Sequence, residues 1–87
     1  MNEKYSRAHK CLVELQTSNR KIKEILKEYK CTITFEYEHL AGYNKCVAIL
    51  SDGINRITAD AITRVDYKVE KTANDALGYL TGRLWLT

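Results

Sequence analysis

Apolar residues recur at alternating steps of three and four along residues 1–30. Residues at this spacing lie on one stripe of an α-helix, so the pattern predicts a single helix over about residues 3–30. At 1.5 Å per residue such a helix is about 40 Å long, well beyond the ~25 Å of a seven-residue strand. The stripe contains Tyr5, Ala8, Leu12, Leu15, Asn19, Ile22, Leu26 and Tyr29.

The polar member of this stripe, Asn19, predicts self-association. A lone Asn among apolar core positions fixes the register of a two-stranded coiled coil, so the stripe is a candidate homodimer interface. Two alternatives stay open. The stripe lies against the chain's own sheet, or the helix breaks near Ser18, because Ser and Asn are poor residues for a helix interior. The candidate interface residues are Leu12, Leu15, Asn19, Ile22 and Leu26.

Polar and apolar residues alternate over residues 31–39, which predicts a half-buried β-strand. Thr32, Thr34, Glu36 and Glu38 face the opposite way from the apolar set. The apolar set is expected to point inward and contains Cys31, Ile33, Phe35, Tyr37 and His39.

Two further strands are predicted over residues 45–51 and 54–58, with Asp52-Gly53 between them. Asp-Gly is a strong signal for a two-residue hairpin, in which Ile49 faces Arg56. Apolar residues lie on both faces of the strand over residues 45–51. This strand is therefore predicted to be central in the sheet and covered on both sides.

Residues 62–70 fit two structures. Their alternation and their β-branched residues favour a fourth strand, whereas apolar residues at helical steps leave a helix as the alternative. A capping box at Thr72 predicts a C-terminal helix that ends near Gly82. The predicted fold class is therefore α+β. Residues 1–87 form a single domain with a long N-terminal helix, a three- or four-stranded antiparallel sheet and a C-terminal helix.

The composition is typical of a small folded domain, because 45% of the 87 residues are hydrophobic. The longest purely apolar run covers residues 46–50, far below the ~20 residues that span a membrane. No secretory signal is evident at the N-terminus. The three cysteines are an odd number without a close pair, which indicates reduced thiols. We therefore expect a cytoplasmic chain without a membrane partner.

The candidate catalytic and metal-binding side chains form no recognisable motif. Cys31, His39 and Cys46 lie near one another in the predicted sheet, but a structural zinc site usually needs four ligands at short paired spacings. A nucleophilic Cys needs a base, and neither His9 nor His39 stands in a known signature. The carboxylates alternate with basic residues, as on a solvated face. The sequence therefore predicts a non-enzymatic protein without a cofactor or metal.

The net charge of +3 belongs to the predicted first helix. Residues 1–30 carry eight Lys or Arg against four Asp or Glu, whereas residues 31–87 carry six against seven. A basic stripe of this kind is a candidate contact surface for nucleic acid or for an acidic partner. Pairing with Glu24 and Glu28 along the helix is the alternative. The stripe consists of Arg20, Lys23, Lys27 and Lys30.

These features together favour a function in binding. Small phage proteins that block host defence nucleases are similar in size and also lack catalytic motifs. The sequence thus predicts a protein-binding regulator or inhibitor that acts by occlusion, in the host cytoplasm if it is phage-encoded. Aromatic residues are enriched at interface hot spots, which makes Trp85 a candidate anchor. A nucleic-acid-binding regulator that uses the basic stripe is the alternative function.

The order of one helix, three strands and one helix resembles the double-stranded-RNA-binding domain in outline. In that family a basic cluster opens the last helix. Here Lys71 alone precedes Thr72, and Asp75 follows. Membership of that family is therefore not predicted.

Overall fold

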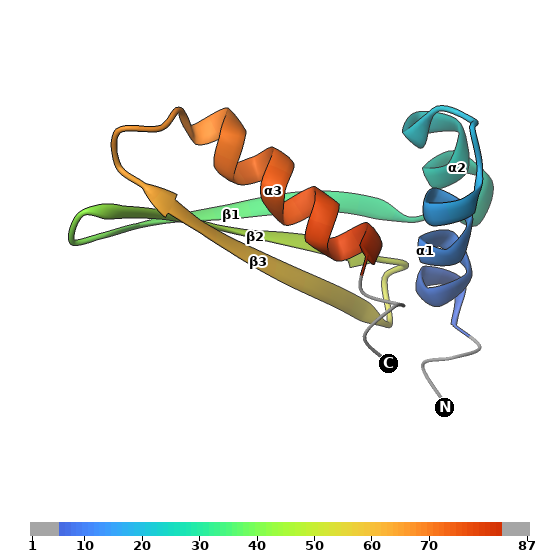
Figure 1. The fold of residues 1–87 in the computed structure, drawn as a ribbon. Coiled ribbons are helices and arrows are strands. Elements are labelled where there is room, and N and C mark those ends of the chain that lie inside the picture. The colour runs from blue at the N-terminus through green and yellow to red at the C-terminus, as the bar shows by residue number, and fades with distance from the viewer. Residues whose placement is uncertain (1–5, 83–87) are drawn as a thin grey trace.

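The computed structural model describes residues 6–82, and within this range the chain has the predicted α+β fold class. Its three strands form one antiparallel sheet. One helix lies across a face of this sheet, and the other two stack at one end of it (Figure 1). The elements are α1 (Arg7–Thr17), α2 (Ile22–Tyr29), β1 (Thr32–Leu40), β2 (Tyr43–Ser51), β3 (Arg56–Arg64) and α3 (Val69–Gly82).

The N-terminal helix is broken near Ser18, as one of the alternatives from the sequence had it, so the continuous 40 Å helix is wrong. Ser18 adopts an extended backbone and ends α1, and its N–H donates to the carbonyl of Glu14 (2.9 Å). The Thr17 hydroxyl donates to the carbonyl of Val13, four residues back (3.0 Å). Short polar side chains of this kind compete for the backbone groups of a helix. The chain can therefore turn, and α2 packs against α1.

The strands form a simple meander in the order β1-β2-β3, with β2 in the centre as predicted. The β1–β2 register runs without a bulge from Thr32 opposite Ser51 to Leu40 opposite Tyr43. Gly42 has a positive φ of 80°, which glycine adopts readily, in the tight turn between these strands.

The β2–β3 connection is longer than the predicted two-residue hairpin. Ile49 pairs with Thr58 instead of Arg56, so the register is displaced by two residues. A displacement of two leaves every side chain on the face that the sequence assigned to it, because side chains alternate with a period of two.

The predicted fourth strand is absent from the described residues. β3 continues to Arg64, the chain turns, and α3 begins at Val69, three residues before the predicted cap at Thr72. Thr72 is fully buried instead, and its hydroxyl is hydrogen-bonded to that of Thr63 on β3. The alternation over residues 62–70 therefore belongs partly to the end of β3 and partly to the turn before α3.

The core lies between α3 and the sheet and continues to α1 and α2. Small side chains such as Ala48, Ala61 and Ala76 are buried at the contact, so α3 lies close to β2 and β3. The larger residues that are fully buried are Leu12, Ile25, Leu50 and Leu80.

No helix among residues 6–82 is long and apolar enough to cross a membrane.

Asp52 joins the β2–β3 loop to α1. Its Oδ1 accepts the backbone N–H groups of Ile54 (2.9 Å) and Asn55 (2.8 Å), and these bonds shape the loop. Its Oδ2 accepts the N–H of Ala8 in the first turn of α1 (3.2 Å). A carboxylate is favourable there because the first N–H groups of a helix have no partner within the helix. The backbone donors of Asn55 and Ile54, in that order, hold the pKa of Asp52 at about 2.

We expect Asp52→Ala to lower Tm by about 5 °C at neutral pH, because it removes the loop bonds and a cap of α1. The pKa of Asp52 falls from 3.8 to about 2 on folding, so its contribution to stability is present above about pH 4 and is lost as the pH falls towards 2. Thermal unfolding from pH 7 to pH 2 should thus show a smaller acid-induced loss of stability in Asp52→Ala than in wild type. The control is Asp60→Ala, at an exposed carboxylate on β3, and equal acid profiles of wild type and Asp52→Ala would contradict the assignment.

Candidate functional site

The most exposed element of the sheet is β1. Eight of its nine residues are exposed, whereas β2 is largely buried. The reason is the position of α3, which packs on β2 and β3 and leaves the β1 side of the sheet uncovered (Figure 1). β1 is also an edge strand, because among the described residues only β2 pairs with it. Its faces and its outer edge are therefore available to a partner.

The face of β1 on the α3 side is apolar and aromatic. Ile33, Phe35 and Tyr37 pair with the buried residues of β2, which confirms that they share one face of the sheet. Phe35 is nevertheless 37% exposed and Tyr37 is 54% exposed. The two rings thus point to the inner face as predicted but stay partly exposed, because a helix about 10 Å wide covers only two strands spaced about 4.8 Å apart.

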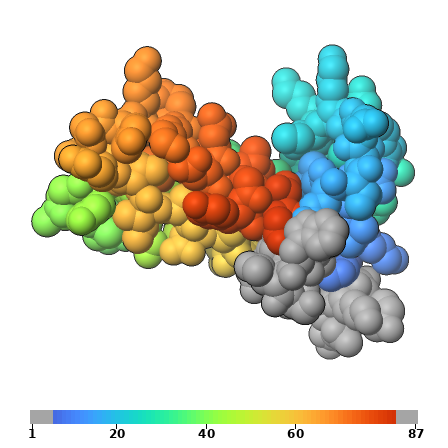
Figure 2. Space-filling view, viewed as in Figure 1, coloured from blue at the N-terminus to red at the C-terminus, as the bar shows by residue number. Residues whose placement is uncertain are grey.

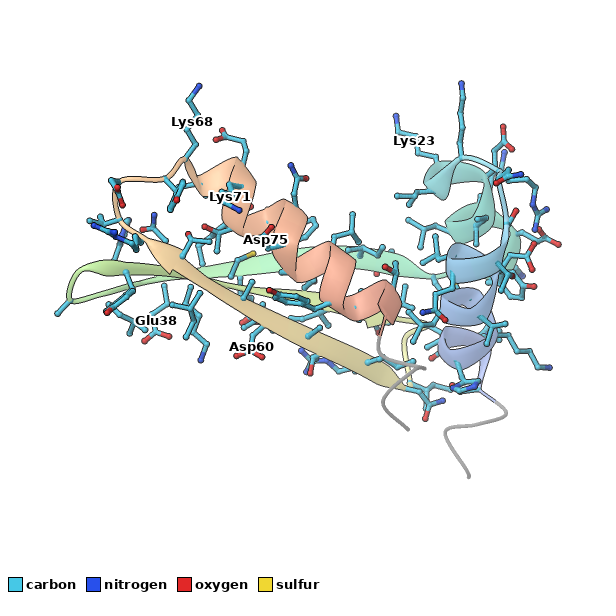
Figure 3. The ribbon with its side chains drawn as sticks, in the orientation of Figure 1. Lys23, Glu38, Asp60, Lys68, Lys71 and Asp75 are labelled. Carbon is cyan, nitrogen blue, oxygen red and sulfur yellow. The ribbon has the colours of Figure 1, made fainter. Side chains whose placement is uncertain are left out.

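The opposite face of β1 is acidic. Glu36 and Glu38 are exposed and, within residues 6–82, make no hydrogen bond or ion pair. Figure 3 shows Glu38 on the side of the sheet away from α3, together with Asp60 of β3. A shallow hollow of about 270 Å³ is lined by Glu36, Tyr37, Glu38, Lys45 and Val47.

The predicted basic stripe is divided by the break between α1 and α2. Arg20 bonds Glu28 of α2 (2.6 Å) and also the Glu14 carboxylate of α1, so its charge is neutralised within the corner between the helices. These bonds hold α2 against α1. Arg20 therefore leaves the predicted contact surface and has an internal role.

Lys23 and Lys27 are one turn apart and share a flank of α2, and Lys30 follows as the left-handed residue that ends the helix. All three are exposed and have no acidic partner within residues 6–82. Figure 3 shows Lys23 on the side of α2 that faces α3, and Figure 2 shows a hollow between the two helices. The predicted pairing of these lysines with Glu28 is wrong, because Arg20 occupies that carboxylate.

The predicted dimer interface is not a single seam. Leu12 is buried in the core, Leu15 and Leu26 pack partly against it, and Asn19 lies in the exposed link between the helices. Among the five predicted interface residues, Ile22 is the only large apolar residue that is exposed, at 42%. The stripe therefore serves largely as the inner face of two helices. Trp85 and Tyr5 lie outside the described residues.

The three cysteines are buried and free. Burial, followed by the neighbouring Cys31 thiol, raises the pKa of Cys11 to about 12. Burial also raises the pKa values of Cys31 and Cys46. Within residues 6–82 no three Cys, His, Asp or Glu side chains lie together as ligands for a metal ion. These thiols are therefore protonated parts of the core at neutral pH.

The chain was also compared with protein-family models, curated proteins and solved structures, and none of these matches it.

The thiols should react only when the protein unfolds. At pH 8 we expect carboxamidomethylation of Cys11 by iodoacetamide to be about 100-fold slower in native protein than in urea, because burial suppresses the thiolate. Mass spectrometry of tryptic peptides measures each rate. A Thr34→Cys variant supplies the control, because position 34 on β1 is exposed and its thiol should react at an ordinary rate. Native labelling of Cys11 as fast as that of this control would contradict a structural role.

Proposed function

We propose that this chain is a non-enzymatic protein-binding regulator whose partner docks on β1. The observation that carries the proposal is a nine-residue edge strand exposed at eight positions, on whose apolar face Phe35 and Tyr37 remain 37% and 54% exposed among the described residues. Proteins usually protect long edge strands with Pro, bulges or covering loops. The β1 strand has no Pro and no bulge, which supports its use as a binding element.

Two kinds of interaction are available to a partner on β1. Its outer edge presents backbone N–H and C=O groups, which an added strand satisfies by β-augmentation. Phe35 and Tyr37 add apolar surface, and aromatic residues often dominate the free energy of an interface. Binding through these groups needs no catalytic residue, so the chain acts by occupying a surface of its partner.

Occlusion of this kind accounts for an inhibitor as well as for a regulator. A phage-encoded blocker of a host defence nuclease is one form of it, in which the bound chain covers the nuclease's substrate-binding surface. The size of the chain suits this role, because an edge strand and its aromatic face engage a partner without a second domain.

A second candidate function is nucleic-acid binding by the α2 lysines. The observation in its favour is the pairing of Arg20 with both nearby carboxylates, which leaves Lys23, Lys27 and Lys30 without acidic partners within residues 6–82. Three free ammonium groups on one helix and its C-terminal cap suit contacts to phosphates. Phe35 is also partly exposed on the sheet, where an aromatic ring can stack on a base.

Removal of the aromatic surface of β1 should abolish capture of the partner. We expect tagged wild type to retain one stoichiometric protein from a lysate of the source cells, and Phe35→Ser/Tyr37→Ser to retain at least about 10-fold less. Quantitative mass spectrometry measures the ratio, and thermal unfolding verifies that the variant is folded. The control is Tyr43→Ser/Tyr79→Ser, at residues 50% and 60% exposed, which should retain the partner. Equal loss in both variants would argue against β1 as the site.

The nucleic-acid function predicts a specific salt dependence. If DNA binds the α2 flank, Lys23→Ala/Lys27→Ala/Lys30→Ala should reduce the slope of log K against log salt concentration by about 2.7 when each lysine contacts one phosphate. Fluorescence anisotropy with a labelled duplex measures this slope. Lys10→Ala/Lys45→Ala/Lys68→Ala changes the net charge equally and should leave most of the slope in place. Absence of wild-type binding at low salt would eliminate this function.

A further inference from the structure

We infer that the segment docking on β1 is an extended strand of alternating basic and apolar residues, with its basic side chains opposite Glu36 and Glu38. The inference rests on the proposed function and gives the chemistry of the partner. The two faces of β1 supply the argument, because they differ in character along the same stretch of backbone.

The geometry of strand addition determines which side chains meet. β1 is regular over its whole length, so an added strand pairs with it residue for residue. Directly opposite side chains in antiparallel pairs share a face and have Cβ atoms about 5 Å apart. Partner residues opposite Phe35 and Tyr37 therefore lie on the α3 side, and those opposite Glu36 and Glu38 lie on the other side. An alternating partner sequence satisfies both faces.

The charges on β1 determine which sign of charge the partner strand should carry. Glu36 has Val47 as its neighbour on β2, so its own sheet offers it no basic side chain at that position. Glu38 has Lys45 opposite, yet no ion pair joins them. An added strand removes water from both carboxylates, and desolvated charges cost free energy unless they are paired. A basic partner offsets that cost, whereas an acidic partner adds repulsion.

The hollow beside these carboxylates gives a basic side chain a place to lie. Glu36 and Glu38 line it together with Lys45 and Val47, and its volume is about 270 Å³. The aliphatic stem of a Lys or Arg covers Val47 while its charged head remains near the two carboxylates, as such side chains commonly do. Glu36 and Glu38 are about 7 Å apart along the strand, so two basic residues spaced by two positions serve both.

A second copy of this chain is the poorer occupant of the edge. Two-fold antiparallel pairing about residue 37 places Glu36 opposite Glu38 of the other copy. Pairing about residue 36 or 38 places a Glu opposite itself. Like charges directly opposite destabilise a strand pair. The three registers centred on residues 36, 37 and 38 are thus unfavourable for self-pairing, whereas a basic strand pairs favourably in each of them.

Two capped nine-residue peptides test the inference, one of alternating Lys and Val and one of alternating Glu and Val. We expect the Lys/Val peptide to bind wild type at least about 10-fold more tightly. Hydrogen exchange by NMR should show protection at β1 amides and not at β3 amides. Glu36→Lys/Glu38→Lys should reverse the preference between the peptides. A peptide of the same composition with its Lys residues grouped should bind more weakly than the alternating one.

The control for net charge is Glu24→Lys/Asp66→Lys, which changes the charge by the same amount at exposed residues outside the sheet and should keep the Lys/Val preference. Equal binding of the two peptides, or loss of preference in this control, would overturn the inference. A wild-type dimer in light scattering that Glu36→Lys/Glu38→Lys alters would overturn it too, since the occupant would be a second copy. The two proposals fail separately. If partner capture depends on Phe35 and Tyr37 but the two peptides bind equally, the proposed function stands and the basic, alternating partner strand is rejected.

Discussion

The carboxylate of Asp52 connects the sheet to the N-terminal helices. It organises the β2–β3 loop through two backbone donors and reaches across to the first turn of α1 through a third. The guanidinium of Arg7 adds a bond to the Asp52 carbonyl (3.3 Å) from the same turn. α1 is therefore held at the end of the sheet beside this loop, and it does not lie across the strands. The exposure of β1 follows from that position, because α3 is left as the sole helix on the face of the sheet within the described residues.

A second polar contact keeps α2 away from β1 as well. Arg20 binds carboxylates of both N-terminal helices, so α2 is folded against α1, and Lys23 lies on the side of α2 that faces α3 (Figure 3). The aromatic and the acidic side chains of the sheet thus lie on opposite faces. The aromatic face of β1 lies on the helix side of the sheet, and Glu36, Glu38 and Asp60 lie on the other side. A partner that lies along β1 meets both chemistries at once, which is why this strand, and neither helix, carries the proposed function.

Much of the local structure could be predicted from the sequence. The alternation in β1 correctly assigned Phe35 and Glu36 to opposite faces, and Asp52-Gly53 correctly marked a connection between strands. The length of the β2–β3 loop was not predictable. It depends on the Asp52 carboxylate, which accepts the N–H groups of Ile54 and Asn55 within the loop and that of Ala8 on α1. The candidate site was missed for a related reason. Phe35 and Tyr37 were expected to point inward, and the sequence predicted two helices that could cover the sheet, so the position of α1 and α2 at its end was needed to show that β1 is left uncovered.

The sequence by itself determined which side chains share a face, that β2 is central and that the chain has an α+β fold. These properties depend on the periods of helices and strands, which neighbouring residues set. The tertiary structure alone decided that the N-terminal helix breaks at the position where the sequence left a break open, that Arg20 pairs with Glu14 and Glu28, and that β1 stays exposed. The spacing of apolar residues along the sequence shows which residues lie on one side of a helix or strand. What covers that side depends on contacts between residues far apart in the chain, such as Asp52 with Ala8.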